Sequence, residues 1–363
     1  MENTIFNIRD FGAVGDGVSD DTTPIREAFA AASACRGTVL VPPGKYITGR
    51  QKMTTGMRLT GMASWSCRGM GSSEFLLRDG ETDCLIDITG AVGCSIVGMS
   101  LTGRFLGENV HGIKLQWAVP NGCGQEDSPT VEDCKICNFT GDGMHYEHVW
   151  CCALRRTMLK DNRGAGLYMD GWDAFIDQNW ISHNGNCGIF APGAASSSMT
   201  GNRIVWNHKA GVRMGNANGW SISANFFDRS MGPGLDLGGK GKTGSLAITG
   251  NYFKRSAKPD VEPFESPYLN SQLWLRGAEN VTITGNTFLI GRDDGSRGVL
   301  SPEYGIVLCR CAHMAVMGNT MQHGSLRENI ITEKCSDMQI GMNVGVPFYT
   351  DNPDKDPERN AQQ

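Results

Sequence analysis

Apolar and polar residues alternate over short segments of the chain, and one such segment recurs along its length. Six copies combine the alternation with one asparagine, and these asparagines are Asn179, Asn202, Asn225, Asn251, Asn286 and Asn319. Successive asparagines are 23, 23, 26, 35 and 33 residues apart. A period near 23 with alternating apolar positions predicts short strands and turns, with one solenoid coil per repeat and inserted loops where the spacing is longer. The asparagines are expected to face inward and to form a ladder of side-chain amides from coil to coil.

Each repeat contains a second strand in which two apolar residues alternate with two variable ones, as in "GIKLQ" at 112–116 and "GMHYE" at 143–147. Side chains of a strand alternate between its faces, so the variable residues should point outward in two columns. The first predicted column is Lys114, His145, Tyr168, Phe190, Arg213, Asp236, Trp274 and Val307. The second is Gln116, Glu147, Asp170, Pro192, Gly215, Gly238, Arg276 and Cys309.

These patterns predict an all-β fold, a single-stranded right-handed parallel β-helix. Leucine-rich repeats share the period, but their leucine consensus is absent from this chain. A cap helix is expected at about residues 20–35, with Asp20 or Asp21 at its N-cap and Pro24 in its first turn. We expect one β-helix domain over residues 1–345, followed by a polar tail over residues 346–363.

The N-terminal segment 7–49 contains "DFGAVGDGVSDDT", a short amphipathic stretch and "VLVPPGKY". It resembles the opening of the pectate-lyase-3 and polygalacturonase-like β-helix superfamily. That resemblance implies a single-domain β-helix that acts on carbohydrate, often as a trimer, but it does not imply one reaction. The residue pattern of polygalacturonases is not met. The strand "GDGMHYE" is also similar, more weakly, to the inulin fructotransferase and difructose-anhydride hydrolase type of β-helix.

Charge and composition narrow the partners. The net charge of −5 and a pI near 5.8 argue against nucleic acid, which favours a basic surface. No apolar run approaches the roughly 18 residues that a membrane span needs. The N-terminus lacks the pattern of a signal peptide, so we expect a cytoplasmic protein in which the 13 cysteines are reduced thiols.

The outward columns combine aromatic side chains with charges of both signs and a histidine, as sugar-binding clefts do. The alternative is an exposed sheet face that carries these side chains but binds no ligand. The centre of the predicted site is "TGDGMHYEHVWCC" at 140–152. The predicted catalytic residues are Asp142, Glu147, Asp170 and His145. The predicted substrate-binding residues are Lys114, Tyr168, Asp173, Phe190, Arg213, Asp236, Trp274 and Arg276.

Paired carboxyl groups on neighbouring rungs favour a glycoside hydrolase, or a transglycosylase, that acts on an oligosaccharide. The first alternative is a lyase that removes the C5 proton of a uronate by β-elimination. The second is a tailspike-like protein that binds glycan without catalysis. Plain turn roles for Asp142 and Asp170 also stay open, because each precedes a glycine. No metal or other cofactor is expected: Cys134 and Cys137 form a CxxC pair, but on a strand their side chains should point to opposite faces, and no tight acidic cluster indicates a calcium site.

Overall fold

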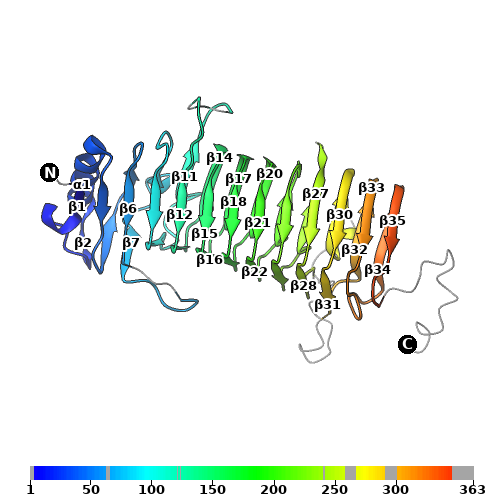
Figure 1. The fold of residues 1–363 in the computed structure, drawn as a ribbon. Coiled ribbons are helices and arrows are strands. Elements are labelled where there is room, and N and C mark those ends of the chain that lie inside the picture. Colours follow the sequence, from blue (N-terminus) through cyan, green and yellow to red (C-terminus); the bar gives the residue numbers. More distant parts are fainter. Residues whose placement is uncertain are drawn as a thin grey trace.

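The computed structural model describes residues 4–62, 66–120, 122, 124–239, 242–257, 267–290 and 301–345. The predicted tail 346–363 lies outside these residues. The described chain forms a long right-handed parallel β-helix, with helix α1 (Thr22–Cys35) at one end and strand β35 (Ser336–Gly341) near the other (Figure 1). The all-β parallel β-helix with a cap helix, predicted from the repeat, is therefore confirmed.

Three parallel sheets run along the solenoid in the described residues. The first sheet contains β1 (Ile5–Asn7), β3 (Thr38–Leu40), β6 (Arg58–Thr60), β9 (Ser95–Val97), β12 (Thr130–Glu132), β15 (Ala153–Arg155), β18 (Phe175–Asp177), β21 (Ser198–Thr200), β24 (Ser221–Ser223), β27 (Thr243–Thr249), β30 (Ala278–Thr284), β33 (Ala312–Met317) and β35. The second contains β2 (Asp16–Asp20), β4 (Gly44–Thr48), β7 (Ser73–Leu77), β10 (Ser100–Thr102), β13 (Lys135–Cys137), β16 (Met158–Lys160), β19 (Trp180–Ser182), β22 (Arg203–Val205), β25 (Phe226–Asp228), β28 (Tyr252–Lys254) and β31 (Thr287–Leu289).

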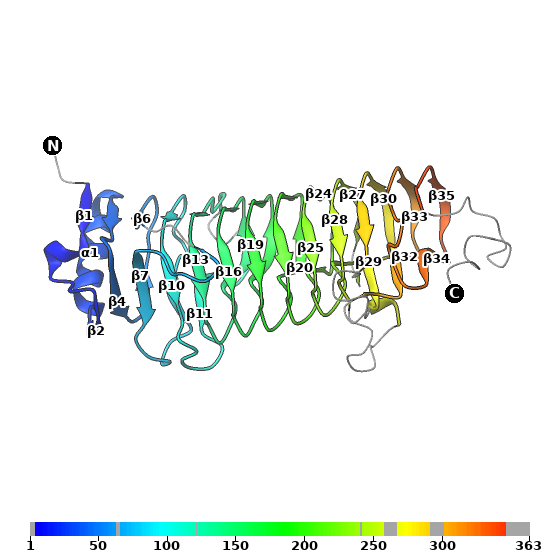
Figure 2. The ribbon, with the colours of Figure 1, turned by 90° about the horizontal axis from the view of Figure 1, so that it is seen from below.

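The third sheet contains β5 (Gln51–Lys52), β8 (Cys84–Asp87), β11 (His111–Gln116), β14 (Met144–Trp150), β17 (Leu167–Trp172), β20 (Ile189–Ala195), β23 (Val212–Met214), β26 (Leu235–Leu237), β29 (Ser271–Arg276), β32 (Tyr304–Cys309) and β34 (Glu328–Glu333). Two short 3-10 helices, η1 (Ile8–Phe11) and η2 (Pro267–Leu269), complete the described elements. A coil passes through the three sheets in turn, so each strand pairs with its equivalents from the neighbouring coils (Figure 2). The described residues include no helix that is long and apolar enough to span a membrane.

The predicted asparagine ladder is confirmed and extends one coil further. The Nδ2 group of each member donates to the Oδ1 atom of the next at 2.9–3.0 Å. The ladder comprises Asn179, Asn202, Asn225, Asn251, Asn286, Asn319 and Asn343. A shorter second ladder, which the sequence analysis missed, joins Asn162, Asn184 and Asn207. These bonds satisfy buried amides and fix the register of successive coils.

The N-terminal motif builds the cap. Helix α1 buries Ile25, Ala28 and Phe29 over the first coils, as its apolar stripe predicts. Asp21 occupies the N-cap position, but its carboxylate accepts from the amides of Val14 and Gly15 instead of from the helix. The first turn is held by Asp20, whose Oδ1 atom accepts from the backbone of Thr22 at 2.9 Å. The aspartates of the motif are therefore structural.

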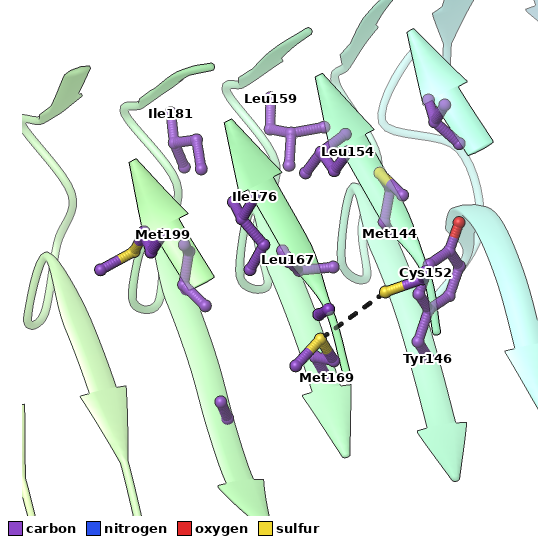
Figure 3. Close-up of a cluster of buried hydrophobic side chains, with 14 of the residues drawn as sticks. Met144, Tyr146, Cys152, Leu154, Leu159, Leu167, Met169, Ile176, Ile181 and Met199 are labelled. Carbon is purple, nitrogen blue, oxygen red and sulfur yellow. Dashed lines mark hydrogen bonds between the residues drawn. The ribbon is translucent and has the colours of Figure 1, made fainter. Parts of the chain in front are cut away.

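A close-packed interior supports the middle of the third sheet (Figure 3). Met144 and Tyr146 of β14 and Leu167 and Met169 of β17 point inward and are buried. Sulfur atoms of Cys152 and Met169 lie 3.9 Å apart in the same cluster. Outward side chains of these two strands therefore stand on a rigid base, which favours precise positioning.

Candidate active site

The strand register of the third sheet confirms the alignment of the first predicted column, although two of its members, Asp236 and Val307, are buried. Lys114 pairs with His145, His145 with Tyr168, and Tyr168 with Phe190. The same column continues through Arg213, Asp236, Trp274 and Val307. Residues of this column lie one strand spacing apart, about 4.8 Å.

The second predicted column is interrupted by two β-bulges, one on each side of β17. Tyr146 pairs with Met169 but Val149 pairs with Gly171, so β14 contains one residue more than β17 in this interval. Strand β20 likewise contains an extra residue, because Asp170 pairs with Gly193. The expected pairs of Asp170 with Glu147 and with Pro192 were therefore wrong. Bulges of this kind redirect side chains and are frequent beside active sites.

Local sequence explains both irregularities. Pro192 has no N–H group and cannot donate to a sheet ladder, so it falls at a bulge. Gly171 has a φ of +145°, and a Cβ atom there would lie 1.9 Å from the carbonyl oxygen of Val149. His148 has a φ of +59°, which turns its side chain outward beside Glu147. The adjacent side chains of Glu147 and His148 in β14 thus both face outward.

His145 stands at the centre of the resulting cluster with both ring nitrogens occupied. Its Nδ1 atom lies 2.7 Å from Asp142 Oδ2, and its Nε2 atom lies 3.1 Å from Glu147 Oε1. Its ring stacks on Tyr168, with centroids 4.4 Å apart and planes at 12°. Asp142 is fixed in turn, because its Oδ1 atom accepts from the amide of Ala165 at 2.6 Å. Asp142 therefore has two roles. It occupies the turn before Gly143, one of the alternatives that the sequence left open, and it orients the ring of His145.

These contacts shift two pKa values in opposite directions. Burial lowers the pKa of His145, but hydrogen bonds to the Asp142 and Glu147 carboxylates outweigh it and raise the pKa above its ordinary value. Burial raises the pKa of Glu147, but hydrogen bonds from Gln116 and His145 outweigh it and lower the pKa. The two shifts have a common cause, because the contact between His145 and Glu147 favours the charged form of each side chain.

A second set of titratable groups lies across the bulge. Burial raises the pKa of Asp170, and the nearby Glu147 carboxylate adds to the effect. His148 Nδ1 lies 3.5 Å from Asp170 Oδ2, a charge contact longer than a hydrogen bond. Burial and the neighbouring carboxylates also raise the pKa of Tyr168. Its phenol is therefore protonated near neutral pH and can donate a proton.

One group in the described residues, formed by His111, Asp142 and His145, has donor atoms within 4.8 Å of one another, a spacing that a metal ion accepts. His111 is 4% exposed, and burial lowers its pKa to about 4. Its Nδ1 atom already accepts from the amide of Asp142 at 2.9 Å. The His111 and His145 rings lie 4.3 Å apart with their planes tilted by 33°, and both ring nitrogens of His145 already contact carboxylates. This geometry favours a hydrogen-bonded cluster over a metal site.

The family model described as the right-handed β-helix region matches residues 121–288 and 193–346. The chain belongs to this right-handed β-helix family. A second model, described as rhamnogalacturonase A/epimerase, pectate lyase-like, matches residues 5–82, which include the N-terminal motif. The superfamily resemblance drawn from that motif is confirmed.

Curated relatives of this β-helix protein come from Azotobacter vinelandii. Mannuronan C5-epimerase AlgE2 is 32% identical over 193 residues, which are 49% of this chain and 19% of that protein. Alginate lyase 7 is 37% identical over 191 residues, which are 49% of this chain and 22% of that protein. The matches therefore span about a fifth of the length of these relatives.

Solved structures agree on the fold. The A-module of mannuronan C-5 epimerase AlgE4 from Azotobacter vinelandii superimposes with a TM-score of 0.60 at 19% identity, covering 95% of this chain and 99% of that one. DFA-IIIase from Arthrobacter chlorophenolicus A6 gives a TM-score of 0.64 at 15% identity, covering 91% and 94%. The comparisons support the predicted carbohydrate-active class, and the hydrolase reaction stays a prediction.

Apart from Asp173, the predicted site residues of this β-helix protein divide into two groups. Asp142, His145, Glu147, Tyr168 and Asp170 come together around the bulges, with Lys114 and Phe190 on the adjoining rungs. The other group lies further along the sheet, beyond Phe190, and contains Arg213, Asp236, Trp274 and Arg276.

Asp236 was predicted to bind substrate, but it is only 1% exposed. Its carboxylate accepts from Arg213 and Arg276 at 2.6 Å each, and the Arg276 guanidinium lies 3.7 Å from the centre of the Trp274 ring. Asp236 therefore orients these arginines and does not face a ligand. Sequence alternation places a residue on a face but does not show that a neighbouring coil covers it.

His148 and a group of tryptophans were not predicted as site residues. His148 was missed because strict alternation ignores bulges. Trp150 donates its Nε1–H to Asp173 at 2.9 Å, which gives this predicted ligand residue a positioning role. Trp117 donates to Asp127 at 2.8 Å, and Asp127 also accepts from the backbone of Trp150. The loop after β11 therefore packs against β14, next to Glu147.

Proposed function

We propose that the protein is a C5-epimerase that acts on a mannuronan-type polyuronate. The similarity to a mannuronan C5-epimerase and an alginate lyase, at 32% and 37% identity over half of this chain, supports this substrate class. Those relatives are much longer, so the activity is argued from the site itself. The observation that carries the proposal is the placement of Lys114 and His145 on adjacent rungs, next to proton-transfer groups on the following rungs.

Removal of the C5 proton of a uronate leaves negative charge that spreads into the adjacent carboxylate. An enzyme therefore needs fixed positive charge at that carboxylate. The ring of His145 is held in place by two carboxylates and by stacking on Tyr168. Lys114 lies on the next rung, and its Nζ atom is held 2.9 Å from Asp83. Lys114 would bind the substrate carboxylate, and His145, whose two ring nitrogens already contact Asp142 and Glu147, would when protonated add positive charge nearby.

The proton transfers need a base and an acid. His148, in its neutral form, would take the C5 proton on its ring nitrogen, and Asp170 beside its Nδ1 atom would stabilise the resulting imidazolium. The C5–H electron pair would pass into the carboxylate as an enediolate. Tyr168 would then donate its phenolic proton to C5 from the opposite face, which inverts the configuration without a redox change. Solvent would restore both groups.

Lyase chemistry branches from the same intermediate. If the C4–O4 bond breaks before C5 is protonated, the electron pair forms a C4=C5 double bond and the leaving oxygen takes up a proton. The lyase alternative from the sequence therefore uses the same residues and differs in the product.

Hydrolysis is the second candidate, and one observation favours it. The pKa of Asp170 is raised and that of Glu147 is lowered, which is how paired carboxyl groups divide the acid and base roles in glycosidases. Asp170 would then protonate the glycosidic oxygen, and Glu147 would act as the nucleophile or activate water.

Proton NMR of mannuronan incubated with the protein in D₂O distinguishes the three reactions. Epimerisation would replace the C5 hydrogen by deuterium and yield guluronate signals at unchanged chain length. Elimination would shorten the chains and give unsaturated ends, and hydrolysis would give saturated reducing ends without deuterium at C5. Shorter chains of either kind would contradict an epimerase.

The proposed base is tested with His148→Gln. Loss of a general base lowers kcat by about 10²- to 10⁴-fold. His313→Gln is the matched control, because His313 also lies beside an aspartate, with Nδ1 2.6 Å from Asp337, but is exposed at the far end of the solenoid. Equal activity of the two variants would refute the role of His148.

A further inference from the structure

An arginine-rich depression lies at the N-terminal end of the third sheet, away from the bulges. Its volume is about 410 Å³, which lies within the range of ~300–1,000 Å³ typical of ligand pockets. Its lining residues are Arg26, Gly49, Arg50, Arg78, Asp79, Glu81, Thr82 and Asp83. Arg26 comes from the cap helix α1, which lies beside the first coils in Figure 1.

The N-terminal motif helps to build this pocket. The Thr22 hydroxyl lies 3.4 Å from Arg78 Nη1 and accepts from the amide of Gly49 at 2.9 Å. Asp20 lies 3.5 Å from the same Arg78 atom. A Cβ atom on Gly49 would meet the Arg78 guanidinium at 3.5 Å, an ordinary van der Waals contact, so these two residues lie side by side in the lining.

A continuous network joins the pocket to the proposed active site. Asp83 binds Arg50 at 2.9 Å and Lys114 at 2.9 Å, so one carboxylate spans the pocket and the rung next to His145. The strand register runs from Lys52, two residues after the pocket residue Arg50, through Asp87 and Lys114 to His145. Three strand spacings separate Lys52 from His145, about 14 Å along the sheet.

The pocket combines cations with acceptors. Asp79 binds Arg78 at 2.5 Å, and Asp83 is shared between Arg50 and Lys114. Arg26 is exposed and has no ion-pair partner among the residues that the structure describes. A uronate unit presents both a carboxylate for a guanidinium and hydroxyls for carboxylates, so it matches this mixture better than an inorganic anion does.

We propose that this pocket is a distal subsite, in which Arg26 binds the carboxylate of a sugar unit in the same polymer chain that His145 contacts. The choice of a uronate rests on the proposed function. The subsite makes affinity depend on chain length, because only oligomers that span about 14 Å reach both places.

The test compares wild type, Arg26→Ala and Arg58→Ala on mannuronate oligomers from the dimer to the decamer. Arg58 is the control, because it is also exposed near the N-terminal end but lies on the first sheet. Calorimetry measures binding without turnover, and KM is measured in parallel. We expect Arg26→Ala to weaken binding of the decamer about tenfold, equivalent to ~1.4 kcal/mol. The dimer should bind all three proteins alike.

Each outcome decides a separate claim. Equal affinity of wild type and Arg26→Ala for the decamer overturns the subsite, whether or not the oligomer is epimerised. A uniform loss at every length, or an equal loss in Arg58→Ala, also overturns it. Arg26-dependent binding of the decamer without any turnover supports the subsite and refutes the proposed epimerase.

Discussion

Truncation of one rung of the asparagine ladder should strongly destabilise the solenoid. The Oδ1 atom of Asn225 accepts from the backbone and side-chain nitrogens of Asn202, at 3.0 and 2.9 Å. Its Nδ2 group donates to the Met199 carbonyl at 2.9 Å and to Asn251 at 3.0 Å. Asn225→Ala removes all four bonds and leaves two buried donors of Asn202 unsatisfied. At ~1–3 kcal/mol for each orphaned group, unfolding should become about 2–6 kcal/mol easier.

Urea denaturation followed by circular dichroism measures this loss, and hydrogen exchange locates it. Asn216→Ala is the control, since Asn216 is exposed in a turn of the same region and should change stability by less than about 0.5 kcal/mol. Amide protection should fall most in the coils on either side of residue 225, because coils contact only their neighbours. A loss below ~1 kcal/mol, or one equal to that of the control, would refute the assignment of the ladder as a main source of stability.

Three further outcomes test the site and its support. Because the pKa of His145 is raised in the folded protein, its protonated side chain stabilises the folded state. This contribution is complete below about pH 6.5, the pKa in the unfolded chain, and is lost as the pH rises through the higher pKa of the folded protein. The Tm difference between wild type and His145→Gln should therefore shrink from about pH 5.5 to about pH 8.5, and a growing difference would contradict the pKa shift. Asp236→Asn should cost about 3–5 kcal/mol in urea unfolding, because it leaves two arginines without their buried partner, and a cost below ~1 kcal/mol would contradict that role. Gly171→Ala should disturb the bulge, and kcat should fall by a larger factor than the factor by which KM changes. Unchanged kinetics would mean that the bulge does not position the site.

The features that repeat were predictable from the sequence. Period and alternation determine which side chains point inward, so the ladder from Asn179 onward and the outward column through His145 were both predicted correctly. The departures from the repeat were not predictable in the same way. The exposure of His148 depends on a bulge, and the burial of Asp236 depends on two arginines from neighbouring coils. Pro192 was a local signal of irregularity, because proline cannot join a sheet ladder.

The bulge in β14 amounts to one inserted amino acid, and that amino acid is His148. Without it, the strand would alternate regularly, Val149 would follow Glu147 on the inner face, and Glu147 would stand opposite Asp170. A deletion of this single residue would thus restore an ordinary coil while removing the imidazole that faces Asp170. Gain or loss of reactivity in such a solenoid therefore requires a change in chain length of only one residue, and the scaffold on either side keeps its register.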